Sequence, residues 1–101
     1  MESLTTLSTV TTSTTTYGIG VYKCGRICFV SFENASITSS YAAGATIVTL
    51  AAQYRPIYHL SFADPISSHR ITIDRNGNIS CSHAIASGDR IRGYATFITS
   101  S

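Results

Sequence analysis

The sequence predicts an all-β protein, an antiparallel β-sandwich or a jelly-roll-like barrel of about seven short strands. Two observations lead to this prediction. Short runs of β-branched and aromatic residues recur along the chain, and glycine, proline, asparagine and aspartate separate them. In addition, no window of about ten residues shows a convincing helical period of apolar side chains.

The segment 71–81 predicts a β-hairpin and its register. A two-residue turn at Asn76-Gly77 would mix apolar and polar side chains on both faces, whereas a three-residue loop over 75–77 separates them. The pairs of that second register are Ile71 with Cys81, Thr72 with Ser80, and Ile73 with Ile79. Asp74 and Gly77 suit a type I turn followed by a left-handed residue that closes a bulge.

The segment 17–32 predicts two strands joined by a tight turn at Cys24-Gly25. One face of this ribbon suits the core, and it carries Tyr17, Ile19, Val21, Cys28, Val30 and Phe32. The opposite face carries Tyr22, Ile27 and Phe29, so neither side is strongly polar. A ribbon that is apolar on both sides needs cover on both sides, and in so short a chain we expect the second cover to be another subunit.

Strand character also marks the segments 46–50, 57–62 and 90–99, while 34–44 is expected to be a loop or a short irregular strand. Pro56 and Pro65 delimit the middle segment, because a residue before proline is pushed out of helical conformations. Residues 1–16 are almost entirely serine and threonine, with Leu4, Leu7 and Val10 at every third position. They are either a flexible leader or the end of a fibrous stalk, and the head is expected to span 17–101.

Composition narrows the classes of function. A chain of 101 residues fits one domain whose burial is marginal without a partner. Only 12% of the residues are charged, the net charge is +2, and there is no basic run, which argues against a nucleic-acid partner. No apolar run is long enough to cross a bilayer and no signal core is present, so we expect neither membrane insertion nor secretion.

The three cysteines cannot all pair within one chain, and their spacing lacks the second ligand pair of a zinc site. We therefore expect Cys24, Cys28 and Cys81 to be free thiols in a reducing compartment, with no metal and no cofactor.

Three segments carry distinct motifs. Tyr22-Lys-Cys-Gly-Arg-Ile-Cys-Phe-Val30 reads as a strand, a glycine turn and a second strand, and 71–79 reads as a hairpin with isoleucine at 71, 73 and 79 and glycine at 77. Thr49-Leu-Ala-Ala-Gln-Tyr-Arg-Pro56 begins with threonine and leucine and ends with tyrosine, arginine and proline. With them, residues 17–101 resemble the C-terminal receptor-binding head domains of bacteriophage tail fibres and baseplates, notably of siphophages. The likeness departs at 51–53, where that family has proline and glycine. It implies a homotrimer that assembles in the host cytoplasm, joins other tail or baseplate proteins at the tail tip of the virion, and attaches it to saccharides on the bacterial surface.

Saccharide binding needs a flat apolar ring face flanked by groups that hydrogen-bond hydroxyls. Asp64 and His69 are among the polar groups on offer, and the residues we select as ligand-binding candidates are Tyr54, Arg55, Tyr58, His59, Arg90, Arg92 and Tyr94. Arg90 and Arg92 would form a fork for a carboxylate or phosphate of a charged glycan, or would pair with a carboxylate of a neighbouring chain. For Tyr54 and Arg55 the alternative is packing at the rim of the barrel.

No sequence feature brings His59, His69 and His83 together, no nucleophile elbow is present, and only five residues are acidic. We therefore expect no catalytic residues and no metal ligands. The leading hypothesis is a non-enzymatic receptor-binding head, and the alternative is a structural module that trimerises and caps a fibre, baseplate or capsid without a ligand of its own. A small glycan hydrolase is a third, weaker hypothesis, because it needs paired carboxylates.

Overall fold

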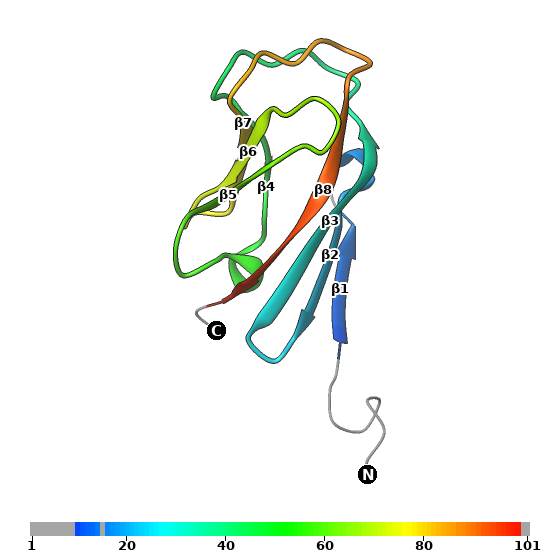
Figure 1. Cartoon of the computed structure of the whole chain (residues 1–101). Helices are drawn as coiled ribbons and strands as arrows, with labels where there is room; N and C mark the ends of the chain where they lie inside the picture. Colours follow the sequence, from blue (N-terminus) through cyan, green and yellow to red (C-terminus); the bar gives the residue numbers. More distant parts are fainter. Residues whose placement is uncertain (1–9, 15, 100–101) are drawn as a thin grey trace.

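The structure is a computed structural model that describes residues 10–14 and 16–99. Within these residues the chain forms eight β-strands in two four-stranded antiparallel sheets that pack face to face (Figure 1). The first sheet has the order β1 (Val10–Thr14), β2 (Gly20–Cys24), β3 (Ile27–Ser36) and β8 (Arg90–Ile98). The second has the order β4 (Thr46–Thr49), β7 (Asn78–Cys81), β6 (Arg70–Ile73) and β5 (Leu60–Ala63). The predicted all-β antiparallel sandwich is confirmed.

Two single turns of 3-10 helix interrupt the strands. They are η1 (Thr16–Gly18), between β1 and β2, and η2 (Ala52–Tyr54), between β4 and β5. Tyr17 lies in η1 with a φ of 70°, so it does not continue β2 as predicted. It packs half-buried against the edge of the core, and its hydroxyl shares a hydrogen bond with that of Tyr41.

The hairpin of β6 and β7 has the predicted register, with Ile71 opposite Cys81 and Ile73 opposite Ile79. The carboxylate of Asp74 accepts hydrogen bonds from the backbone N–H groups of Asn76 at 2.9 Å and Asn78 at 3.0 Å. Gly77 has a φ of 81°, and a Cβ placed there would lie 2.9 Å from the carbonyl oxygen of Leu50. Two features therefore require glycine at this position: the left-handed backbone conformation of the turn, and the close approach of the Leu50 carbonyl, which leaves no room for a Cβ.

The core lies between the two sheets. The first sheet contributes five of the six side chains expected from the alternation of 17–32, which are Ile19, Val21, Cys28, Val30 and Phe32. The second contributes the inner face of the hairpin, which is Ile71, Ile73, Ile79 and Cys81. Strand alternation alone thus places most of the buried apolar side chains.

The boundary expected at residue 17 differs from the structure, because residues 10–14 form β1 and pair with β2 from Val10 opposite Cys24 to Thr14 opposite Gly20. Threonine is β-branched and therefore has a high propensity for strands. Polar side chains are common in a strand at the edge of a sheet, which is the position of β1. Residues 1–9 lie outside the described part of the chain, and their assignment as leader or stalk stays a prediction.

Two other boundaries differ from the expectation. The strand expected at 57–62 begins only at Leu60, because Pro56 and Ile57 run beside the end of β8, where the Ile57 N–H donates to the Ile98 carbonyl at 3.1 Å. The segment therefore contacts the first sheet before it enters the second. β3 extends to Ser36 past a bulge between Phe32 and Ala35, into the segment expected to be a loop.

Candidate functional site

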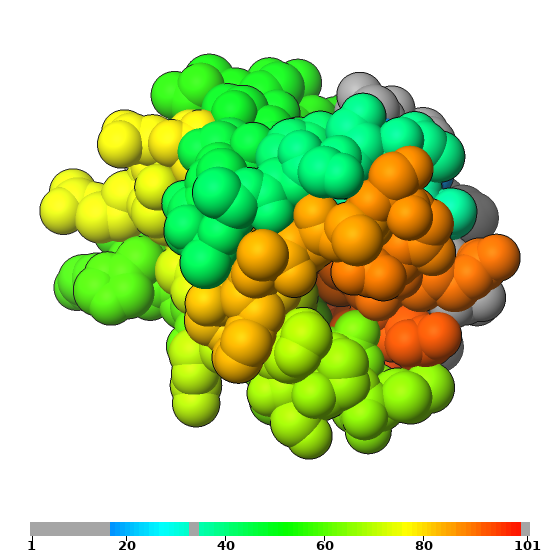
Figure 2. All heavy atoms as spheres, turned by 90° about the horizontal axis from the view of Figure 1, so that it is seen from above, coloured from blue at the N-terminus to red at the C-terminus, as the bar shows by residue number. Residues whose placement is uncertain are grey.

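A pocket of about 350 Å³ opens at the end of the sandwich where several connecting loops meet. Its walls are the β5–β6 loop, the β7–β8 loop and the start of β8. In Figure 2, which looks onto this end, the surface is hollowed between the yellow-green β5–β6 loop and the orange segment that leads into β8. The lining residues are Asp64, Ser67, His69, Ile71, Cys81, Ile85, Gly88, Asp89, Arg90, Ile91 and Arg92.

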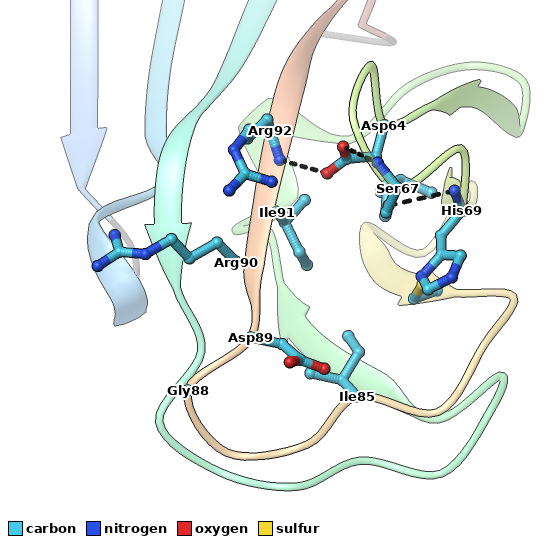
Figure 3. A pocket seen from close by; sticks show the side chains of 11 residues that line it. Asp64, Ser67, His69, Ile85, Gly88, Asp89, Arg90, Ile91 and Arg92 are labelled. Carbon is cyan, nitrogen blue, oxygen red and sulfur yellow. Dashed lines mark hydrogen bonds between the residues drawn. The ribbon is translucent and has the colours of Figure 1, made fainter.

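Asp64 holds one wall of the pocket in place. It is only 2% exposed, and its carboxylate accepts a hydrogen bond from the backbone N–H of Ile66 at 2.8 Å. It also accepts from the backbone N–H groups of Ser67 at 3.0 Å and Arg92 at 2.8 Å (Figure 3). The first two bonds close the β5–β6 loop, and the third ties that loop to β8. Asp64 is therefore a positioning residue for the pocket.

The environment of Asp64 keeps its carboxylate charged. Burial alone would raise the pKa of this carboxyl group, but the three backbone N–H bonds and the charge of Arg92 outweigh burial and lower the pKa below 3.8. At neutral pH the group is ionised, and its lone pairs are engaged by the protein.

His69 and His83 stack beside the pocket, with ring centroids 4.1 Å apart and planes inclined by 14°. They form the next rung of the β6–β7 ladder beyond Ile71 and Cys81. The strands stay aligned there, because the Ser82 N–H donates to the carbonyl of Arg70 at 2.9 Å and the Ser82 hydroxyl accepts from the Arg70 N–H at 3.1 Å. The expectation that nothing brings the histidines together is thus wrong for this pair.

The signal for the pair was present in the sequence. Extending the predicted register by one rung of two residues places His69 opposite His83, on the face that points into the sandwich. The rung lies where the apolar core ends and the pocket begins. His59 lies elsewhere, at the margin of a second groove.

Asp89 supplies a second carboxylate to the pocket. Its Oδ2 accepts the backbone N–H of Ala86 at 2.9 Å, which fixes the turn before β8, and the side chain is exposed. Figure 3 shows Asp89 and Ile91 directed into the hollow, with Ile85 close to Asp89. This side of the pocket therefore combines a hydrogen-bond acceptor with apolar surface.

The arginine fork expected from Arg90 and Arg92 does not face the pocket. In Figure 3 the Arg90 side chain runs away from the hollow across β3, and the guanidinium of Arg92 lies on the opposite side of β8 from His69. What Arg92 directs to this site is its backbone N–H, which Asp64 accepts. The alternation of the strand explains this, because Ile91 faces inward and its two neighbours face outward.

The other sequence candidates lie in different parts of the molecule. Tyr54 is buried in the core and has no surface for a ligand, and Arg55 donates from Nε to the Leu50 carbonyl at 3.3 Å. Tyr58 and His59 are exposed beside a second, mostly apolar groove of about 420 Å³. The residues that line this groove are Pro56, Ile57, Tyr58, His59, Leu60, Thr96, Phe97 and Ile98.

Tyr94 belongs to an apolar surface on the outer side of the first sheet, which we call the outer face. Its large side chains are Tyr22, Ile27, Phe29, Tyr94 and Ile98. Phe29 lies between Tyr22 and Tyr94, with ring centroids 6.1 Å and 5.7 Å away. Apart from Phe29, these side chains are between 43% and 70% exposed, so the prediction that β2 and β3 are apolar on both sides is confirmed.

Comparisons with known protein families and with curated proteins give no relative of this chain. No model of a known protein family matches the sequence. A search of curated proteins gives no match. Among the residues that the structure describes, no three histidine, cysteine, aspartate or glutamate side chains gather as a metal-ligand set, and no helix is long and apolar enough to span a membrane.

Proposed function

We propose that this protein is a receptor-binding head of a bacteriophage tail, and that the pocket between the β5–β6 and β7–β8 loops binds a saccharide of the bacterial surface. The observation that carries the proposal is the pocket itself. It has the volume of a small-ligand site, and its wall joins carboxylate, imidazole and apolar groups. Sugar rings present both hydroxyl groups and apolar C–H faces, so they match such a mixed lining.

The position of the pocket also supports the proposal. Loops at the end of a rigid sandwich commonly carry binding sites, because the sheets fix the loop ends while the loop sequences vary. The role we propose is binding without cleavage, since Asp64 already accepts three backbone hydrogen bonds and is poorly placed to act as an acid or base. A single site of this size would bind weakly, and several heads on one virion would supply avidity.

The test is adsorption of the purified protein to bacterial cell-wall polysaccharides and to a glycan array. We expect binding to at least one saccharide, and we expect Asp89→Ala to weaken it while Arg75→Ala, at the exposed hairpin tip, leaves it unchanged. Amide chemical shifts of Gly88 and Ile91 should move on addition of the bound sugar. A protein that binds no saccharide, or binds one without affecting these amides, would contradict the proposal.

The outer face favours a second candidate, a structural module that trimerises and caps a fibre or baseplate without a ligand of its own. Exposed tyrosine and isoleucine side chains on three adjacent strands are unusual for a small monomer, and self-association would cover them. Light scattering on the intact chain separates the mass of a trimer from the 10.8 kDa monomer. A trimer that binds no glycan favours the structural role, and a monomer at micromolar concentration argues against it.

A further inference from the structure

We infer that the pocket selects saccharides that donate hydrogen bonds, uncharged sugars and amino sugars, over sugars that carry a carboxylate or phosphate. This inference rests on the proposed function, because it concerns the ligand of the same pocket. It also reverses the preference that an arginine fork would give.

The charged groups directed into the hollow are acidic. The Asp89 side chain points into the hollow and Asp64 lies in its wall (Figure 3). The cationic side chains of β8 are oriented otherwise, since Arg90 extends across β3 and the Arg92 guanidinium lies beyond β8 from His69. The charge of Arg92 acts on Asp64, so Asp89 is the carboxylate that an anionic sugar entering the hollow would meet at close range.

The two carboxylates have different parts in this selectivity. Asp64 has its oxygens engaged by three backbone N–H groups and lies near the charge of Arg92, so it holds the wall in place and offers a ligand little hydrogen-bonding capacity. Asp89 uses Oδ2 for one turn hydrogen bond to Ala86, and an ionised carboxylate has about four acceptor sites, so it retains capacity for ligand hydroxyl or ammonium groups.

The rest of the lining suits the ring of an uncharged sugar. Ile85 and Ile91 line the hollow next to Asp89, and although they are only 5% and 3% exposed they leave a small apolar contact for the C–H face of a pyranose whose hydroxyls reach the carboxylate. His69 closes the opposite side, backed by His83 at 4.1 Å.

The experiment compares sugars that share one ring and carry either no charge, an amino group or an acidic group. Glucose, glucosamine, glucuronic acid and glucose 6-phosphate share one ring, and the same sets built on galactose and mannose guard against a wrong stereochemistry. Binding of each to the intact chain at pH 8 is measured from the Gly88 and Ile91 amide shifts. We expect the uncharged and amino members of the recognised set to bind at least about tenfold more tightly than its two acidic members.

Asp89→Asn isolates the charge, because its amide oxygen can still accept the Ala86 N–H and keep the turn. We expect it to remove most of the discrimination against the acidic sugars and to weaken glucosamine more than glucose. Asn76→Lys is the matched control, since it also raises the net charge by one but lies at the exposed hairpin tip, and it should leave the ratio unchanged.

The outcomes separate the two proposals. If acidic sugars bind at this pocket as tightly as uncharged ones, or if Asp89→Asn leaves the ratio unchanged, the selectivity is wrong while the receptor-binding role stands. If no sugar of any charge moves the pocket amides and no polysaccharide binds, both proposals fail.

Discussion

The pocket and the outer face are built by different means. The pocket walls are loops whose positions depend on a few side-chain hydrogen bonds, above all those of Asp64, whereas the outer face sits on three strands held by a continuous backbone ladder. A single substitution should therefore deform the pocket, while the outer face should tolerate substitution and change only what it contacts. The comparison teaches that stability tests and association tests probe separate parts of this molecule.

The largest effect is expected from Asp64→Ala. The substitution leaves three backbone N–H groups without their acceptor at a buried position, which we expect to lower the free energy of unfolding by about 3 kcal/mol. Urea unfolding of the variant and the wild type measures the difference. A loss below about 0.5 kcal/mol would show that solvent replaces Asp64 and that the loops do not depend on it.

A pH series sharpens the same point. Because the pKa of Asp64 is lower in the folded chain than its ordinary value of 3.8, ionisation stabilises the fold fully above about pH 5, and this stabilisation is lost as the pH falls through 3.8 towards the folded pKa. Asp64→Asn lacks the titrating group, so its deficit relative to the wild type should shrink as the solution is acidified. A deficit that stays constant from pH 7 to pH 3 would contradict the lowered pKa.

On the outer face, Ile27→Arg should act on association and leave folding intact. Ile27 on β3 lies opposite Ile98 on the adjacent strand β8, and both are exposed, so a charge there costs little in the isolated chain but repels a copy packed against it. If the wild type is an oligomer, light scattering should show the variant as a monomer with an unfolding free energy within about 1 kcal/mol of the wild-type subunit. Thr46→Arg, exposed on the second sheet, is the control and should keep the wild-type mass.

The smallest effect is expected in the thiol reactivity of Cys24 and Cys28, which lie on the outer and inner sides of the β2–β3 hairpin. Burial raises the pKa of the Cys28 thiol to about 11, despite the nearby charge of Lys23, so the thiol stays protonated at pH 8. Cys24 is half-exposed at the end of β2. A thiol reagent should modify Cys24 first, and Cys24→Ser should remove the fast phase, whereas rapid labelling of Cys28 would mean that the sheets open.

Much of the fold could be predicted because alternation in strands reports burial directly. The hairpin register followed from the rule that one face must be apolar, and the inner face of β2 and β3 followed from the same rule. β1 was not predicted as a strand, because a run of threonine and serine carries no alternation of apolar and polar residues. This segment forms a strand because its backbone pairs with β2, and not because of a pattern in its own sequence.

The pocket was harder to predict, because loops from distant parts of the chain form it. The pairing of His69 with His83 could have been predicted, because the register that places Ile71 opposite Cys81 also places these two histidines opposite each other. Alternation in β8 places Arg90 and Arg92 on the side opposite to Ile91, but that the hollow lies on the side of Ile91 depends on where the β5–β6 loop sits, which no local pattern specifies. Asp64 was recognised only as a polar group near a proline, and its partners lie on another strand.

All three hydrogen bonds of the Asp64 carboxylate come from main-chain N–H groups, so they do not depend on which side chains follow it. Positions 65–67 can then accept many different residues without losing the loop's shape, provided that Asp64 stays and no proline enters at 66 or 67, whereas Ser68, with a φ of 64° and an N–H that donates to the Asp64 carbonyl, is restricted by its backbone. Successive substitutions in the β5–β6 loop would therefore change the chemistry of the pocket rim while the loop backbone kept its position.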